Sequence, residues 1–306
     1  MENPSRLAIR KNAGNGEGKS KMKKEQLLYA ITQYPALCQR KTGNTHKGTF
    51  GTLGVIGSAE GMSGAIVLAG KSALKAGCGK VFLGFAQSQL PLPFIDSAPE
   101  LMLKTAFALI NQQAISAWAI GCGLGLSTDS ECILSTILAQ RIDDKPYVFD
   151  ADALVLMAKL KSPISLNQYC VLTPHPKEAA ILLNCTLRDI QNDREGSAKE
   201  IATLYHCWAI IKGQNTVITS PTGEITINTT GNSGLSTAGS GDVLTGVMGS
   251  FLAQGMTMSD AVKSAVWIHG MAADILVEKG IGPIGLTASE LIDTIRNIRN
   301  QLHSLT

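Results

Sequence analysis

The chain has 306 residues, of which 44% are hydrophobic and 17% charged, and its formal net charge is +3. A chain of this length, with a mean hydropathy of +0.12, can bury a large core. The small charge and the 5% aromatic content argue against a nucleic-acid-binding groove, and no apolar run reaches the roughly 20 residues of a membrane-spanning helix.

The first segment of the chain is polar. Residues 1–20 are basic and rich in glycine, so we predict a disordered tail there, ahead of a single domain over residues 21–306. The first helix of that domain is expected near residues 22–33, where Leu27, Leu28 and Ile31 fall on one face.

Beyond residue 50, short apolar runs alternate with helical patterns. The runs that predict strands cover residues 52–56, 81–85, 117–120, 147–150, 169–172 and 209–212. The helical patterns cover residues 65–76, 129–140, 153–158 and 195–205, with another helix starting near Lys177. This alternation is typical of a parallel sheet built from strand–helix–strand units.

The pattern changes after the last of these strands. Residues 216–219 and 225–228 flank the turn signal Pro221-Thr222-Gly223 and predict a hairpin within or beside the sheet. Only helices are expected after the hairpin, near residues 242–253, 259–278 and 287–302.

Cysteine and histidine placement narrows the chemistry. The seven cysteines are widely spaced and include no Cys-x-x-Cys pair, which favours free thiols in a reducing cytoplasm. The five histidines show no metal-binding spacing such as His-x-x-x-His.

The strongest motif is the Gly/Ser-rich segment Thr-Ala-Gly-Ser-Gly-Asp over residues 237–242, which directly precedes an apolar helix. Glycines let backbone N–H groups approach a ligand, and a helix N-terminus carries partial positive charge. Gly239, Ser240 and Gly241 therefore predict an anion hole. Asp242 has two compatible interpretations, a helix cap or a general base.

Two more glycine-rich loops join a predicted strand to a predicted helix, over residues 57–64 and 121–125. Neither matches the dinucleotide fingerprint G-x-G-x-x-G or the Walker phosphate loop. The second, Gly-Cys-Gly-Leu-Gly, is either a further anion-binding loop or a tight turn.

Polar residues follow two further strands. Asp150 and Asp152 lie at a C-terminal strand end, the edge where open α/β sheets bind ligands, although one of them could simply cap the next helix. The prolines around His175 predict an extended loop that exposes this histidine to a ligand. Glu178 is either an ordinary first-turn acid or a ligand of Mg²⁺ through water.

The loop Lys212-Gly213-Gln214-Asn215-Thr216 ends another predicted strand. It could cradle phosphates or an adenine ring, or it could be a bare hairpin turn. His269 lies in the middle of a predicted helix, where packing is the ordinary explanation, and we place it outside the site.

Taken in order, several segments resemble one family, the ADP-dependent NAD(P)H-hydrate dehydratases. They are His46-Lys47-Gly48, Met62-Ser63-Gly64-Ala65, residues 121–125, 150–154 and 173–176, and Thr230-Gly231-Asn232 through Asp242. The resemblance runs from about His46 to the C-terminus, and the ordered combination is more specific than any one segment.

The resemblance implies a ribokinase-like three-layer α/β/α sandwich with a mostly parallel central sheet. It implies dehydration of the S epimer of hydrated NADH or NADPH, with Mg²⁺ present and ADP consumed to AMP and phosphate. It also implies a homo-oligomer, often a tetramer, without a nucleic-acid or membrane partner. By similarity, the hydrated cofactor would contact Ala65, Gly123, Gly125, His175 and Asp242. The adenine nucleotide would contact Lys212, Gly213, Gln214, Asn215, Thr216 and Gly241.

The chain departs from the family pattern at several positions. The family often has proline at the positions of Ser63, Cys122, Thr229 and Ser233. Gln214-Asn215 replaces Ala-Gly, which leaves the choice between ADP and ATP open. No fused epimerase domain is expected, because the segment before His46 is too short for one.

In the reaction that the resemblance implies, Asp242 accepts the proton of the substrate hydroxyl as its oxygen attacks the terminal phosphoryl of ADP, and phosphate then leaves. Two other interpretations compete: an ATP-dependent small-alcohol kinase of the same fold, and a non-catalytic nucleotide-binding sensor. Residues 150–154 and 173–176 weigh against the kinase, and the intact Asp242 weighs against the sensor.

Overall fold

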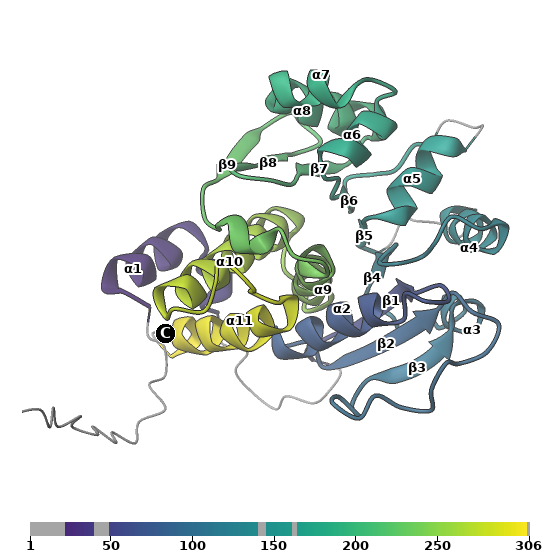
Figure 1. Ribbon diagram of the computed structural model, residues 1–306, viewed down its shortest axis with the longest axis horizontal. Coiled ribbons are helices and arrows are strands. Elements are labelled where there is room, and N and C mark those ends of the chain that lie inside the picture. The colour runs from purple at the N-terminus through teal and green to yellow at the C-terminus, as the bar shows by residue number, and fades with distance from the viewer. Residues whose placement is uncertain (1–21, 40–48, 140–144, 161–163, 305–306) are drawn as a thin grey trace, which may run out of the picture.

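The computed structural model describes residues 22–39, 49–139, 145–160 and 164–304. Its centre is a nine-stranded sheet in the order β3-β2-β1-β4-β5-β6-β7-β8-β9 (Figure 1). The strands are β1 (Thr52–Gly57), β2 (Lys80–Phe85), β3 (Met102–Thr105), β4 (Ala117–Ile120), β5 (Tyr147–Phe149), β6 (Cys170–Leu172), β7 (Trp208–Ile211), β8 (Thr216–Thr219) and β9 (Ile225–Asn228).

Neighbouring strands from β3 through β7 pair in parallel, while β8 and β9 pair antiparallel at the edge. The predicted parallel sheet and its hairpin are therefore confirmed, and the hairpin extends the sheet itself. The sequence analysis missed β3, whose four residues are all only partly buried and lack an apolar run. It also missed the short helices α3 (Ala106–Ile110) and α7 (Leu187–Asn192).

Helices cover both faces of the sheet, as the three-layer prediction requires (Figure 1). The helices α2 (Gly64–Lys75), α9 (Ser240–Ala253), α10 (Met258–Glu278) and α11 (Ala288–His303) share one core with one face of the sheet. On the other face, α3 and α7 are joined by α4 (Thr128–Ala139), α5 (Asp152–Lys159), α6 (Pro176–Leu182) and α8 (Arg194–Tyr205). The strands buried between these layers are apolar along their length, because neither of their faces meets water.

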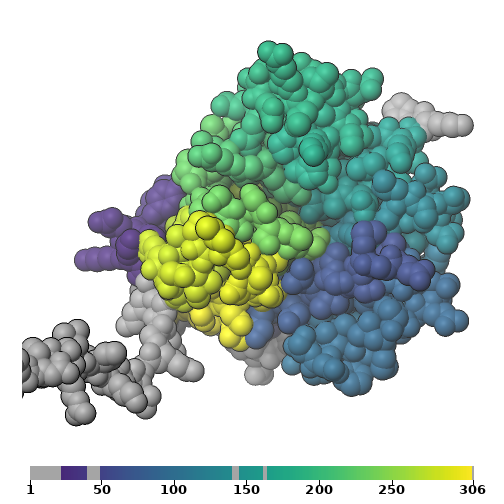
Figure 2. Space-filling view, viewed as in Figure 1, coloured from purple at the N-terminus to yellow at the C-terminus, as the bar shows by residue number. Residues whose placement is uncertain are grey.

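The first described helix, α1 (Lys24–Gln33), packs beside the C-terminal helix, and Figure 2 shows the two next to each other. Met22 N donates to Gln301 Oε1 over 2.7 Å, which ties the two ends of the described chain together. Ala30 is the buried residue of α1 and Leu27 packs against the core, whereas Leu28 and Ile31 are exposed, so the predicted apolar face was wrong at both of these residues. The expected tail over residues 1–20 and His46-Lys47-Gly48 lie outside the described residues.

The strand order reverses direction between β1 and β4, and ligands bind parallel sheets at the carboxyl edge near such a point. Helix α9 crosses this part of the sheet and packs closely on α2. A Cβ atom at Gly246 would collide with the Ala69 carbonyl oxygen, so only glycine permits this approach. The N-terminus of α9 is thereby held at the edge where the loops of the central strands end. No helix in the described ranges is long and apolar enough to cross a membrane.

Candidate active site

Three segments that are distant in sequence meet at the carboxyl edge of the sheet. A Cβ atom placed on Gly241 would lie 3.5 Å from Lys212 Nζ and 3.6 Å from Asp150 Oδ2. The Gly/Ser-rich segment before α9, the end of β7 and the end of β5 therefore form one site.

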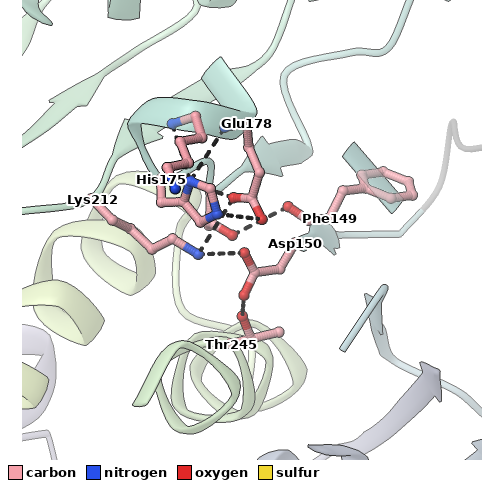
Figure 3. Close-up of polar contacts among 8 residues, drawn as sticks. Phe149, Asp150, His175, Glu178, Lys212 and Thr245 are labelled. Atoms are coloured by element: carbon pink, nitrogen blue, oxygen red, sulfur yellow. Dashed lines mark hydrogen bonds and ion pairs between the residues drawn. The ribbon is translucent and has the colours of Figure 1, made fainter. Parts of the chain in front are cut away.

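The centre of the site is a buried ion pair (Figure 3). Lys212 Nζ lies 2.6 Å from Asp150 Oδ1, and Thr245 Oγ1 of α9 donates to Asp150 Oδ2 over 2.7 Å. Burial opposes ionisation of Asp150, but Lys212 and the hydrogen bonds outweigh burial and hold the pKa of the carboxyl below its usual value. Burial also opposes the charge of Lys212, and Asp150 and Glu178 outweigh it and raise the pKa of the ammonium. Both groups are thus charged at neutral pH.

His175 and Glu178 lock each other at the start of α6, where His175 is the N-cap residue. His175 Nδ1 accepts hydrogen bonds from the amides of Lys177 and Glu178 over 3.1 and 3.2 Å. Glu178 Oε2 accepts from the His175 amide over 2.8 Å, and its Oε1 lies 3.3 Å from His175 Nε2. Burial, with help from the Lys212 charge, lowers the pKa of His175. Since Nδ1 is an acceptor, we infer that the neutral ring carries its proton on Nε2.

The side chain of His175 is 47% exposed, so the predicted exposure of this histidine is confirmed, while its contact with a ligand stays a prediction. The carboxyl of Glu178 is far more enclosed, and burial raises its pKa to about 7. Glu178 Oε2 also lies 4.0 Å from Lys212 Nζ, which brings this pair to the same site as the ion pair.

Asp242 lies inside the first turn of α9. The helix begins at Ser240, two residues before the predicted start, and its N-cap residue is Gly239 in a left-handed conformation with φ 86°. The helix-cap interpretation of Asp242 was therefore wrong, because a cap residue precedes the first turn. Burial raises the pKa of Asp242 to about 6, while a hydrogen bond from the Cys122 thiol opposes that rise. A carboxyl with such a pKa suits a general base near neutral pH.

The predicted anion hole is only partly open. The Ser240 amide donates weakly to Thr237 O over 3.4 Å, but no acceptor in the described part of the chain takes the amide of Gly241. Ser240 Oγ lies 3.2 Å from Nε2 of His269. His269 is buried in the core, as its packing interpretation requires, and burial lowers its pKa to about 4. It nevertheless contacts the anion-hole segment, a link that sequence reasoning missed.

The loops after β1 and β4 are joined to each other. Ser58 N donates to Cys122 O over 2.9 Å and Ala59 N to Gly123 O over 2.7 Å. Gly123 has φ 60°, and a Cβ atom on it would come within 3.0 Å of the Ala65 Cβ. Ala65 and Gly123, two residues assigned to the substrate by resemblance, are therefore neighbours.

The two acids after β5 have separate partners. Asp150 pairs with Lys212, whereas Asp152 Oδ2 accepts from the Gly125 amide over 2.8 Å. Neither is the cap of α5, because Ala151 occupies that position, so the cap expectation was wrong. Ala151 has φ 52° and ψ −123°, a costly backbone conformation for a residue with a side chain. Such strain is typical of sites where side-chain direction is fixed by function.

The loop after β7 shows why asparagine can stand at position 215. Asn215 has φ 54°, a left-handed value that asparagine tolerates better than most residues with a side chain. Lys212 N donates to Pro174 O over 2.9 Å, which ties this loop to the segment before His175. Arg194 of α8, which the sequence analysis did not single out, donates hydrogen bonds to the carbonyls of Ile211 and Gln214.

Thr245 was also missed. Its hydroxyl lies one turn after Asp242 in an otherwise apolar helix, and this placement could have marked it as a site residue.

Metal binding by protein groups alone is not supported within the described ranges, where no three His, Cys, Asp or Glu side chains form a metal-binding group. Two sizeable cavities, of about 810 and 340 Å³, lie away from the site. The first lies between α5, α6 and α8, and the second at the opposite end of α9. The site is thus identified by its chemistry and not by cavity size.

Comparisons with known proteins agree with the motif order. The family model described as NAD(P)H-hydrate dehydratase matches residues 53–297. An ADP-dependent (S)-NAD(P)H-hydrate dehydratase of Neisseria meningitidis is 43% identical over 282 residues, covering 91% of this chain and 95% of that protein. Bifunctional NAD(P)H-hydrate repair enzymes also match, and this chain spans about half of their length.

Solved structures share the fold. The ADP/ATP-dependent NAD(P)H-hydrate dehydratase of Bacillus subtilis, co-crystallised with ATP and Mg²⁺, superposes with a TM-score of 0.79 at 29% identity, covering 90% of this chain and 98% of that one. A ribokinase-like superfamily protein of Enterococcus faecalis superposes with a TM-score of 0.78 at 22% identity, covering 87% of this chain and 92% of that one, and confirms the ribokinase-like fold. The matched family model, which spans most of the sequence, and the Neisseria relative show that this chain belongs to the NAD(P)H-hydrate dehydratase family.

Proposed function

We propose that this chain dehydrates the S epimer of hydrated NADH or NADPH and consumes ADP to AMP and phosphate. The observation that carries the proposal is the meeting of Asp242, Gly241 and the Lys212–Asp150 pair at one sheet edge. A base, an open helix N-terminus and a fixed cation are the groups that phosphoryl transfer to a hydroxyl requires. The named activity of the Neisseria relative supports the same reaction.

In the first step, Asp242 accepts the proton of the substrate hydroxyl while that oxygen bonds to the β-phosphorus of ADP. The bond between this phosphorus and the bridging oxygen breaks, and AMP leaves. The Gly241 amide and the Lys212 ammonium, which are neighbours in the site, would stabilise charge on the transferred phosphoryl. Asp150 and Thr245 hold the ammonium in place.

In the second step, phosphate leaves the substrate ring. The lone pair of the ring nitrogen expels the phosphate, and loss of a proton from the adjacent carbon restores the double bond. His175, locked by Glu178, would contact the hydrated cofactor through its half-exposed ring. Ala65 and Gly123 would provide a close backbone surface beside that ring.

The residues present fit Mg²⁺ bound mainly by nucleotide phosphates and water, the arrangement that this ion prefers. Glu178 would bind the ion through water. Burial disfavours the charged form of this carboxyl and raises its pKa, and a nearby cation would stabilise that charged form. When bound, Mg²⁺ would supply neutralisation of the phosphate oxygens. ADP is the donor that the Neisseria relative's name supports, and Gln214-Asn215 leaves ATP as the alternative that the assay compares with it.

We also propose a single-domain, cytoplasmic homo-oligomer, with the tetramer as the state to test. No disulfide joins any of the seven cysteines, all of which lie in the described ranges, and this suits a reducing compartment. Helix α1 carries Leu28 and Tyr29 at 65% and 52% exposure, an apolar surface that a second copy could cover. Light scattering on the purified full chain measures the assembly directly.

The test of the activity is recovery of NADH absorbance from S-epimer hydrated NADH, with Mg²⁺ and either ADP or ATP, against a control without nucleotide. Nucleotide-dependent recovery is expected. A stable phosphorylated product would point instead to a small-alcohol kinase, and nucleotide binding without turnover would point to a sensor.

Asp242→Asn tests the assigned base. We expect turnover to fall by about 10²–10⁴-fold, the contribution of a general base, with ADP binding retained. Near-normal turnover of this variant would remove Asp242 from that role.

A further inference from the structure

The loop that joins β7 to β8, residues 212–215, is held from one side by side chains; we call it the nucleotide loop. Arg194 Nη2 donates to Ile211 O over 2.9 Å, and Arg194 Nη1 donates to Gln214 O over 2.6 Å. Thr216 Oγ1 donates to Gly213 O over 2.9 Å. The carbonyl that precedes the loop, at Ile211, and two carbonyls within it, at Gly213 and Gln214, therefore have protein donors.

The amides of the same loop are free of protein acceptors. Within the described chain, no oxygen accepts from the amides of Gly213, Gln214 or Asn215, and all three residues are exposed. In a trans peptide the carbonyl and the following N–H point in opposite directions. Because the Gly213 and Gln214 carbonyls are held by Thr216 and Arg194, the amides of Gln214 and Asn215 face away from those side chains. Successive exposed amides of this kind form an anion-binding concavity.

The start of helix α8 fixes the position of Arg194. It is the first residue of α8, and Asp193, the N-cap residue of that helix, accepts from Gly196 N over 2.7 Å. In Figure 1, α8 lies beside β7 and β8. Gly213 permits the contact, since a Cβ atom there would lie 3.3 Å from Arg194 Nη2.

We propose that Arg194 is a positioning residue for the adenine nucleotide: it holds the Ile211 and Gln214 carbonyls and, together with the Thr216 contact to Gly213 O, turns the amides of Gln214 and Asn215 toward a phosphate group. The identity of the ligand rests on the proposed function. The planar guanidinium reaches two carbonyls from one side chain, which the single ammonium of lysine cannot reproduce with the same geometry.

The test compares Arg194→Gln and Arg194→Lys with the unmodified full chain, by calorimetric titration with ADP and by steady-state kinetics. We expect ADP binding by Arg194→Gln to weaken roughly 10-fold to 100-fold, the value of hydrogen bonds from a charged donor. The KM for ADP rises in proportion, while kcat and the KM for the hydrated cofactor stay within about threefold of the unmodified chain. Arg194→Lys is expected to lie in between.

The matched control is Arg188→Gln, which removes an exposed arginine of the neighbouring helix α7 and leaves ADP binding unchanged. ADP affinity of Arg194→Gln within about twofold of the unmodified chain would overturn the inference, as would an equal loss in the control. Should Arg194→Gln not fold, Thr216→Val removes the remaining carbonyl contact and tests the same geometry. If the unmodified chain neither binds ADP nor turns over, the proposed function itself fails, which distinguishes the two claims.

Discussion

Removing the cation of the buried ion pair is the sharpest test of how the site is held together. In Lys212→Met the methionine fills much of the lysine volume but leaves the Asp150 carboxylate, which is 1% exposed, without its partner. Breaking a buried pair from one side costs about 3–5 kcal/mol, because an uncompensated charge remains in the interior. We expect that loss in the free energy of unfolding near neutral pH, measured by urea denaturation followed by circular dichroism.

The reverse change should cost less. Asp150→Asn leaves the Lys212 side chain, which is 20% exposed and can turn toward water, and the new amide oxygen still accepts from Thr245. The double variant Asp150→Asn with Lys212→Met should also be more stable than Lys212→Met alone, since no buried charge is left unpaired.

The cost of Lys212→Met should depend on pH. In the unmodified chain, the pKa of Asp150 is lower in the folded state than in the unfolded state. Its pairing with Lys212 therefore stabilises the fold at pH values above the unfolded-state pKa, and this stabilisation is lost as the pH falls through the folded-state pKa. Without Lys212, we expect burial to outweigh the remaining hydrogen bonds from Thr245 and Thr173 and to raise the folded pKa of Asp150, so protonation relieves the penalty. The loss should therefore be smaller at about pH 5 than near neutral pH. A loss under about 1 kcal/mol, or one that is equal at both pH values, would refute this reasoning.

Two further outcomes follow from the same site. The kcat/KM of the unmodified enzyme should fall as pH drops below about 6. Burial raises the pKa of Asp242 to about 6, and a protonated carboxyl cannot accept the substrate proton. A kcat/KM that stays constant down to pH values well below 6 would contradict this role of Asp242. Gly121→Ala should lower both the melting temperature and the activity. The backbone of Gly121 has φ 122°, and a Cβ atom there would collide with the Asp150 carbonyl oxygen. Gly64→Ala serves as the control in thermal unfolding, because a Cβ atom at Gly64 meets open space. A melting temperature for Gly121→Ala equal to that of the control would show that the loop can move aside.

Much of the fold was predictable because buried parallel strands have a simple signature. The β1 and β4 segments are buried throughout and apolar apart from Thr52, and the helical patterns between strands are regular. Edge strand β3 carried no such signal, since it is only partly buried and includes Lys104. The start of α9 was misplaced by two residues, because Gly239 and not the acid supplies the cap conformation.

The sequence predicted several residues of the candidate site, but it did not predict which of them contact one another. Ordered motifs pointed to Asp242, His175 and Lys212. The pairing of Lys212 with Asp150 joins residues 62 positions apart, and no periodicity in the sequence reports such a contact. Arg194 lies at the start of a polar helix and shows its role only when the nucleotide loop folds back beside it.

The strained backbone at Ala151 bears on how the chain tolerates changes in length. Asp150 and Asp152 stand on either side of it and serve two different loops, one through Lys212 and one through the Gly125 amide. Inserting or deleting one residue here would move both carboxylates away from their partners at once, so neither the contact with Lys212 nor the one with the Gly125 amide would be kept. The turn at Gly223, which lies between the exposed Thr222 and Glu224 and where a Cβ would meet open space, has no comparable constraint. Length variation among proteins with this site should therefore collect in the β8–β9 turn and be absent between β5 and α5.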